Sequence, residues 1–361
     1  MRNRRAGLGL IAGVASLALA MCGCDAGSSS STEGETIGIA MPTQASPRWI
    51  TDGNSVVKDL KADGYKTKLV YGDDDPQTQV SQIQDLIAKH VSALIIAAID
   101  NKSLNGVLQQ AFDAKIPVIS YDRLILGTKH VDYYASFDND QVGRLEARYI
   151  VEKLGLEDGK GPFNIELFAG SPDDNNTKYF FEGAMHLLQP YFDSKQLVVR
   201  SGQTALNQVT TLRWDGPTAK KRMAHLLATS YKTSTVDAVL SPYDGMSIGI
   251  LEALKAEGYG SAARSLPVIT GQDAELASVK SIIAGEQAQT VYKDTRELAD
   301  VAATMVNNIL THQQVRVNDT RTYDNGVKPV PAYLLQPKSV DKKNYEIALV
   351  ATGYYTDRDL K

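Results

Sequence analysis

Strand-like and helix-like stretches alternate along most of this chain, and that alternation restricts the possible folds more than any other feature. Thr36 to Met41 is a β-branched and apolar run, and Lys66 to Tyr71 alternates in the manner of a strand. Ala93 to Ile99 is continuously apolar, as expected for a strand covered on both faces. Apolar residues at helical spacing lie between these runs. This rhythm predicts an α/β fold with doubly wound parallel sheets.

The rhythm continues far enough for two such sheets. About 325 residues follow the leader and tether described below, which is a comfortable length for two domains. In open sheets of this kind, a ligand binds outside the carboxyl ends of the strands. The loops after the strands are therefore the expected place of a site. Further strands are expected at 117–121, 163–168, 196–201, 236–240, 266–270 and 289–292.

A short apolar leader opens the chain and ends at two cysteines. Three arginines among the first five residues precede an apolar run over 8–21, which is the layout of a secretory signal over 1–24. The run is too short to span a bilayer comfortably. A cysteine at such a junction is the usual acceptor of a lipid anchor in bacterial lipoproteins. Cys22 and Cys24 compete for this role, and the small residue before Cys24 favours Cys24.

Residues 25–35 predict a flexible tether, because AGSSSSTEGE at 26–35 has no apolar residue larger than alanine. A tethered globular head is expected to work outside the membrane, near a membrane partner. No cysteine follows Cys24, which excludes thiol catalysis and a cysteine zinc site in the head. The net charge is −4, with 38 basic and 42 acidic residues and no basic stripe, so nucleic-acid binding is not expected.

The loops after the predicted strands collect polar and aromatic side chains. Carboxylates accept hydrogen bonds, arginine and lysine donate them, and asparagine does both. A sugar suits that mixture, because each hydroxyl donates and accepts and the C–H faces of the ring are apolar. Both tryptophans of the chain, Trp49 and Trp214, belong to the set, which favours a neutral polyol over a phosphate or a metal. The loops lie at 46–49, 121–123, 170–176, 214–215, 242–244, 271–273 and 292–294.

Several motifs resemble those of the type I periplasmic sugar-binding proteins of ABC importers, which include the ribose-, xylose- and galactose/glucose-binding proteins. They are similar above all to the multiple-monosaccharide (aldose) branch, over nearly the whole of 37–361. The most specific motifs are RWITDGN at 48–54, YDRLI at 121–125, SFDNDQVG at 136–143, FNIELFAGSPDDNN at 163–176 and KDTREL at 293–298.

The resemblance implies two doubly wound lobes joined by a three-segment hinge, which close on one sugar. The N-terminal lobe is expected to comprise 36–137 plus 294–323, and the C-terminal lobe 138–293 plus 324–361. The crossings are expected near 137–139, near Lys293 and near 323–326.

The resemblance also implies ten ligand contacts. Alternatives stay open for some of them: Trp49 as a core residue, the Asp122–Arg123 pair as a lobe–lobe salt bridge, and Lys293 as a hinge lysine. The ten expected contacts are Arg48, Trp49, Asp122, Arg123, Asp174, Asn176, Trp214, Tyr243, Asp273 and Lys293.

Four residues in or near these loops need separate comment, because a role in ligand binding is not the only one expected for them. Relatives that bind ribose, xylose or galactose carry asparagine where Tyr243 stands, so Tyr243 either touches the sugar or only packs. Asp244 is well placed to cap the next helix, so a mostly structural role is expected for it. Asp173 is expected to be a surface acid. Lys178 lies where some relatives place an arginine on the sugar, but it is left out of the expected set.

Other functional classes fit less well. Residues 245–249 spell the G-x-S-x-G pattern of hydrolases, but Ser247 is expected inside a helix rather than on a tight turn. A glycosidase would need two carboxylates across one bond, for which Asp122 and Asp273 are the candidates. Asp73–Asp75 lack the glycine and the distal glutamate of a calcium loop, so a solvated acidic turn is expected. A repressor of this fold would carry a DNA-binding headpiece where this chain has its leader.

The resemblance thus implies a monomeric, lipid-anchored receptor, held at the cell surface or in the periplasm, that delivers a free monosaccharide to an ABC permease. No chemistry, cofactor or metal is expected. D-Galactose, D-glucose, D-xylose and L-arabinose are the expected ligand candidates. A sugar-sensing receptor for chemotaxis or signalling, with the same site, is the alternative.

Overall fold

The computed structural model describes residues 34–361. The predicted signal 1–24, most of the tether 25–35, and both Cys22 and Cys24 lie outside the described residues. Within 34–361, every helix is too short or too polar to cross a membrane. The described residues form two lobes, each built on its own sheet, and both lobes belong to one compact unit.

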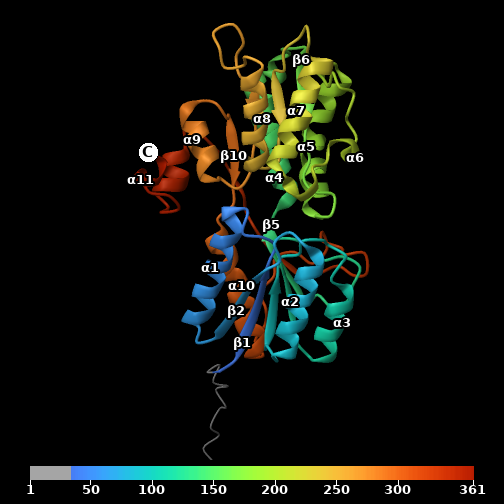
Figure 1. The fold of residues 1–361 in the computed structure, drawn as a ribbon, viewed down its shortest axis with the longest axis vertical. Coiled ribbons are helices and arrows are strands. Elements are labelled where there is room, and N and C mark those ends of the chain that lie inside the picture. The colour runs from blue at the N-terminus through green and yellow to red at the C-terminus, as the bar shows by residue number, and fades with distance from the viewer. Residues whose placement is uncertain (1–33) are drawn as a thin grey trace, which may run out of the picture. The chain divides into compact units, whose positions relative to one another are not determined.

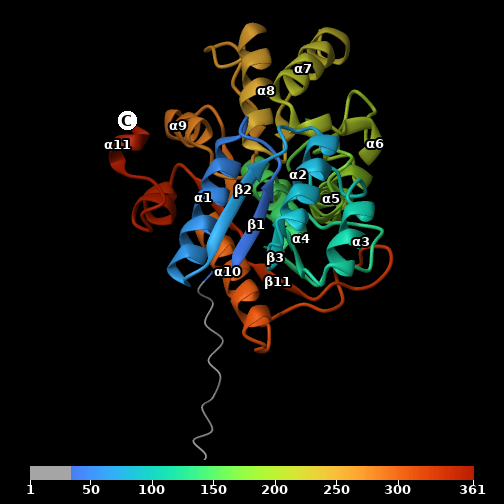
Figure 2. The same ribbon diagram turned by 60° about the horizontal axis from the view of Figure 1, so that its bottom comes forward.

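The first lobe is built on a parallel six-stranded sheet with the order β11-β5-β4-β3-β1-β2 (Figure 1). Helices α1 (Pro47–Ala62) and α10 (Thr295–Leu310) pack on one face, and α2 (Pro76–Ala88) and α3 (Asn105–Asp113) pack on the other. Figure 2 shows α1 on the opposite side of β1 from α2 and α3. The strands are β1 (Thr36–Met41), β2 (Lys66–Tyr71), β3 (Ala93–Ile96), β4 (Val118–Tyr121), β5 (Tyr133–Phe137) and β11 (Ala332–Leu335).

The second lobe is built on a parallel sheet with the order β7-β6-β8-β9, and β10 and β12 add an antiparallel pair. Helices α4 (Asn139–Leu154) and α5 (Asn176–Asp193) cover one face, and α7 (Gly216–Ser230) and α8 (Asp244–Ala256) cover the other. The strands are β6 (Phe163–Leu167), β7 (Leu197–Val198), β8 (Ala238–Leu240), β9 (Val268–Ile269), β10 (Gln289–Tyr292) and β12 (Lys338–Asp341). The shorter helices are α6 (Leu206–Val209), α9 (Leu276–Ala284) and α11 (Asp357–Leu360).

Aspartates in the loops define where several helices begin. Each accepts a hydrogen bond from a backbone N–H in the first turn, which satisfies a donor that has no partner inside the helix. Asp294 accepts from the N–H of Arg296 at 3.1 Å, and Asp215 accepts from Thr218 at 2.8 Å. Asp75 and Asp138 cap α2 and α4 in the same way. These caps fix the loop residues beside them, among them Lys293 and Trp214.

The predicted α/β class with parallel sheets is confirmed, but the end of the chain differs from the prediction. β11 pairs with β5, with Ala332 opposite Tyr134. The assignment of 324–361 to the second lobe is therefore wrong for 332–335. The third crossing lies between β11 and β12, and Tyr323 is buried in the core of the first lobe. A strand of four residues carries little pattern of its own, because its place in a sheet is decided by tertiary packing.

Candidate functional site

A cavity of about 390 Å³ lies between the lobes, and its lining comes from both of them. All ten side chains expected from the sequence line it, including Tyr243 and Lys293, for which other roles were considered. The first lobe contributes loops after β1, β2 and β4, and the second contributes loops after β6, β7, β8, β9 and β10. Their meeting follows from topology, since the carboxyl ends of parallel strands lie at one edge of each sheet.

Arg48, in the first turn of α1, is the centre of a buried ionic cluster. One of its terminal nitrogens bonds Asp122, and the other lies 3.4 Å from both carboxylate oxygens of Asp273. Lys293 Nζ adds a second cation, 3.0 Å from Asp273 Oδ1 and 3.9 Å from Asp122 Oδ1. Burial alone would raise the pKa of Asp122, but Arg48 and Lys293 bring that pKa below its ordinary value. Asp122 is therefore an ionised acceptor at the cavity wall.

A third carboxylate, Asp52, lies behind Arg48 rather than in the cavity lining. Its Oδ2 is 3.4 Å from Arg48 Nε, and the side chain is fully buried. Burial raises the pKa of Asp52 to about 7, and the nearby charge of Arg48 only partly opposes that rise.

Asp52 should make the free energy of unfolding depend on pH. Its pKa is about 7 in the fold and about 3.9 in an unfolded chain. The fold therefore holds the proton more tightly, and the stability gained this way is full below pH ~4 and is lost as pH rises to ~7. As pH rises from 5 to 8, the free energy of unfolding of Asp52→Asn should increase by about 2–3 kcal/mol relative to that of the parent, because one pKa unit is worth about 1.4 kcal/mol. Urea denaturation without ligand measures this difference, and parallel pH profiles would contradict it.

Aromatic rings complete the cavity. Trp49 is only 4% exposed and belongs to the first-lobe core, and the guanidinium carbons of Arg48 and Arg123 lie 4.5 and 5.0 Å from its ring centroid. Trp49 thus packs in the core and lines the cavity as well. Trp214 lies edge-on to Tyr243, and its Nε1 is buried without a hydrogen-bond partner among the described residues. A Cβ on Gly170 would come within 1.9 Å of the Trp214 ring, so glycine is required there.

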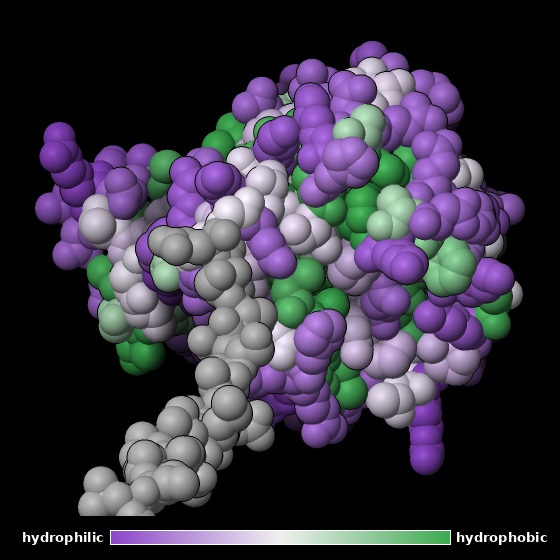
Figure 3. Space-filling view, turned by 90° about the horizontal axis from the view of Figure 1, so that it is seen from below, coloured by the Kyte–Doolittle hydropathy of each residue, from purple (hydrophilic) through white to green (hydrophobic). Residues whose placement is uncertain are grey.

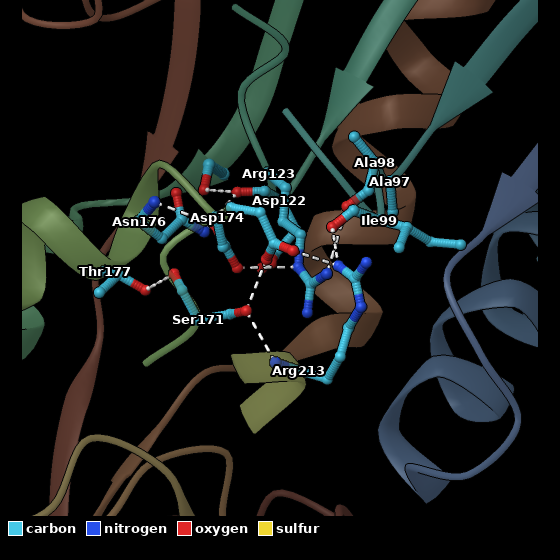
Figure 4. A network of polar contacts seen from close by, with 12 residues as sticks. Ala97, Ala98, Ile99, Asp122, Arg123, Ser171, Asp174, Asn176, Thr177 and Arg213 are labelled. Carbon is cyan, nitrogen blue, oxygen red and sulfur yellow. Dashed lines mark hydrogen bonds and ion pairs between the residues drawn. The ribbon is translucent and has the colours of Figure 1, made fainter. Parts of the chain in front are cut away.

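Arg123 reaches the second lobe rather than its sequence neighbour (Figure 4). Its Nε lies 2.9 Å from Asp174 Oδ2, and its Nη1 donates to the carbonyl oxygen of Ala98 at 3.2 Å. Arg123 thus forms a lobe–lobe salt bridge, the alternative left open above, but its partner is Asp174, and Asp122 and Arg123 do not pair with each other. The reason is local: Asp122 has a left-handed backbone (φ 59°), and its carboxylate is directed to Arg48 and Lys293 instead. The charge of Arg123 lowers the pKa of Asp174, but burial outweighs it and the pKa is raised.

Asn176, the first residue of α5, connects both lobes through its amide. Its Nδ2 donates to the carbonyl oxygen of Asp122 at 2.9 Å. Its Oδ1 accepts from Tyr134 at 3.1 Å and from Asn139 at 3.0 Å. One amide hydrogen therefore remains for a ligand.

Tyr243 lines the cavity with its hydroxyl held by the protein. It donates to Glu275 Oε1 at 2.8 Å, and the hydroxyl of Ser46 in the first lobe donates to the same oxygen at 3.2 Å. Burial and the charge of Glu275 raise the pKa of Tyr243 well above its ordinary value, so it stays a neutral donor. The ring, more than the hydroxyl, is free to meet a ligand.

Comparisons with known proteins decide the family. The periplasmic binding protein domain matches residues 37–314. The chain is 59% identical over 326 residues to the multiple sugar-binding periplasmic receptor ChvE of Rhizobium radiobacter, covering 90% of this chain and 92% of that protein. The chain belongs to the periplasmic binding protein family. It is also 59% identical over 326 residues to the multiple sugar-binding periplasmic protein SbpA of Azospirillum brasilense, covering 90% of this chain and 91% of that protein.

A crystal structure of similar fold carries a sugar. It is an ABC transporter solute binding protein from Clostridium phytofermentans with bound β-D-glucose, with a TM-score of 0.87 at 44% identity, covering 91% of this chain and 100% of that chain. The predicted type I fold is confirmed by this match. The expectation of a binding protein rather than an enzyme is confirmed as well, because these relatives are receptors and binding proteins.

Two acidic residues of this periplasmic binding protein differ from the expectations. Asp244 is the first residue of α8 and not its N-cap, which is Tyr243. Asp244 instead accepts from the N–H of Glu275 at 2.8 Å and from Gln287 Nε2 at 2.9 Å, and so supports the loop that carries Asp273. Asp173 is not a free surface acid, because it pairs with Arg213.

Two expectations about other residues agree with the structure. Ser247 lies inside α8, fully buried, with its hydroxyl 2.7 Å from the carbonyl oxygen of Thr270, so it is no exposed nucleophile. Lys178 is exposed and does not line the cavity, and its nearest acid is Glu182 at 4.0 Å.

Sequence reasoning missed several residues that line the cavity of this binding protein. Gln272 Nε2 donates to the carbonyl oxygen of Pro242 at 2.8 Å, while its buried Oε1 has no partner among the described residues. Asp74 lines the cavity although it belongs to the acidic turn expected in solvent, whereas Asp75 caps α2. Position beside a predicted contact was the available signal for two of them, since Gln272 precedes Asp273 and Arg213 precedes Trp214. The missed residues include Asp74, Phe180, Arg213, Gln272 and Glu275.

Proposed function

We propose that this periplasmic binding protein captures a free aldopyranose between its two lobes and delivers it unchanged to an ABC permease. The observation that carries the proposal is the convergence of ionised acceptors, guanidinium donors and aromatic rings from both lobes on one cavity. Pockets of about 300–1,000 Å³ suit small ligands, and this one is near the lower end. The solute-binding role of the Clostridium relative supports the link to a permease.

We propose D-glucose, D-galactose, D-xylose and L-arabinose as ligands. The multiple-sugar names of the curated relatives and the glucose in the similar crystal structure support this group. The presence or absence of one hydroxymethyl group changes apolar contact by only about 1–3 kcal/mol, so a relaxed site is expected. We further propose a monomer. The large exposed apolar side chains of residues 34–361 lie in separate elements, and on the face in Figure 3 hydrophilic and hydrophobic residues are interspersed.

Calorimetric titration with a panel of sugars tests the proposal. Saturable binding of at least one of the four aldoses is expected, and chromatography should recover the ligand unchanged. Turnover of any sugar or ester by the pure protein would contradict it. So would binding restricted to oligosaccharides, amino acids or phosphorylated sugars.

We propose that Cys24 carries a lipid anchor and that the tether lets the head reach its permease. The apolar leader, the small residue before Cys24 and the Gly/Ser-rich tether support this. Cys24→Ser should release the full-length protein from the membrane fraction, and Cys22→Ser is the matched control that should stay bound. Mass spectrometry of the mature N-terminus identifies the modified residue, and an anchored Cys24→Ser protein would refute the assignment.

A further inference from the structure

Two arginines, one from each lobe, meet at the end of β3 (Figure 4). Arg123, in the first lobe, donates to the carbonyl oxygen of Ala98 in its own lobe and pairs with Asp174 in the other. Arg213, in the second lobe, donates to the carbonyl oxygen of Ile99 in the first lobe at 3.3 Å and pairs with Asp173 in its own. Each arginine thus bonds one backbone carbonyl of the first lobe and one carboxylate of the second lobe.

The backbone next to Arg213's partner also crosses between lobes. The N–H of Asn101 donates to the carbonyl oxygen of Asp173 at 3.0 Å. The loop after β3 is therefore linked to the second lobe twice, by Arg213 in the loop after β7 and by Asp173 in the loop after β6. Any motion that separates the lobes at this edge must break both links.

Arg213 also belongs to a strained segment that carries an aromatic wall of the cavity. Arg213 and Trp214 both have φ of 57°, which is uncommon for residues other than glycine. Such strain persists only where the surroundings enforce it. The N–H of Arg213 donates to Ser171 Oγ at 2.8 Å, and the N–H of Trp214 donates to the carbonyl oxygen of Thr211 at 3.0 Å. The link to Ile99 is the contact of this segment that depends on the other lobe.

We infer that Arg213 is a closure latch, which holds the lobes together at the β3 edge and positions Trp214 against the ligand. This inference rests on the proposed function, because the latch sets how long a captured sugar stays. The bond from Arg213 to the Ile99 carbonyl forms only when the lobes meet, so the latch governs release rather than encounter. The protein already supplies partners for the Arg213 guanidinium, namely the Ile99 carbonyl and the Asp173 carboxylate. The expected effect on release therefore does not require a bond between Arg213 and a hydroxyl of the ligand.

Stopped-flow tryptophan fluorescence with D-glucose tests the latch, since both tryptophans line the cavity. Arg213→Ala should raise the dissociation rate constant by about 10–100-fold and change the association rate constant by less than about threefold, as affinity differences within one site usually arise in dissociation. Asp173→Asn should act in the same direction. Arg222→Ala is the matched control. Arg222 donates to the carbonyl oxygen of Leu167 at 2.8 Å, a bond inside the second lobe, and this variant should leave both rate constants unchanged.

Other outcomes would overturn the latch. Unchanged rate constants in Arg213→Ala would do so, and so would a loss confined to association. A third contrary result would be that Arg213→Ala speeds the dissociation of D-glucose but not that of one deoxyglucose. Arg213 would then bond directly to the hydroxyl that this deoxyglucose lacks. Small-angle X-ray scattering without sugar separates this inference from the proposed function. Arg213→Ala should have a larger radius of gyration than the parent and Arg222→Ala even if no sugar on the panel binds, and an equal radius would contradict the latch.

Discussion

Replacing Arg123 with alanine should weaken monosaccharide binding by about two to four orders of magnitude. The guanidinium offers five donors in one plane, and within residues 34–361 only the Nε bond to Asp174 and the Nη1 bond to Ala98 use them. Charge-assisted bonds to ring hydroxyls are worth about 1.5–3 kcal/mol each, and about 1.4 kcal/mol is a factor of ten. The substitution also leaves Asp174 without its cation in a buried position, where burial already raises its pKa. Calorimetry with D-glucose measures the loss.

Two further variants separate a ligand contact from a structural role for Arg123. Arg123→Lys should recover only part of the affinity, because one ammonium group cannot reproduce a planar fork. Arg148→Ala is the surface control: Arg148 pairs with Glu157 at 3.0 Å in solvent, and its loss should leave affinity unchanged. Parental affinity in Arg123→Ala, or failure of that variant to fold, would favour a purely structural lobe–lobe pair.

Replacing Arg48 with methionine should lower the free energy of unfolding by about 3–5 kcal/mol, the usual loss when one partner of a buried ionic group is removed. Arg48 is the cation nearest to Asp52 and binds Asp122 and Asp273, all of them buried. Lys293 would remain near Asp122 and Asp273 but is not paired with Asp52. Methionine keeps much of the apolar volume, so the loss reports on charge rather than on packing. Urea denaturation at pH 8, where Asp52 is largely ionised, measures the effect.

A double variant tests the electrostatic cause. Adding Asp52→Asn to Arg48→Met removes one of the stranded carboxylates and should recover part of the lost stability. Binding of D-glucose should stay weak in the double variant, because Asp122 and Asp273 still lack their shared arginine. If Arg48→Met were as stable as the parent at pH 8, or if Asp52→Asn recovered nothing, the cluster would not be held together by this charge.

The location of the site could be predicted from the sequence, whereas its pairing could not. Arg48, Asp122 and Asp273 follow strands of parallel sheets, and topology alone brings such loops to one edge. Which acid meets which base depends on backbone angles that the sequence does not display. Asp122 adopts a left-handed conformation, which turns it toward Arg48 and leaves Arg123 for Asp174.

The fold shows the same division. Long apolar or alternating runs such as β1 and β2 were predictable, because six residues are enough for a pattern. β7 and β9 have only two residues each. Their predicted ranges were longer because apolar residues flank these strands in the sequence without pairing in the sheet. β5, β11 and β12 were not predicted at all. β11 joins the first sheet beside β5 after α10 has already brought the chain back from the second lobe, and no local pattern encodes that long-range pairing.

A crystal structure of the protein grown with D-glucose tests the central claim most directly. One pyranose ring should occupy the cavity between the lobes, unmodified, within hydrogen-bond distance of Arg123 in the first lobe and of at least one polar side chain in the second. The Trp214 indole should lie against the sugar. A sugar bound elsewhere on the protein, a cleaved or covalently attached sugar, or an empty cavity at saturating D-glucose would contradict the account.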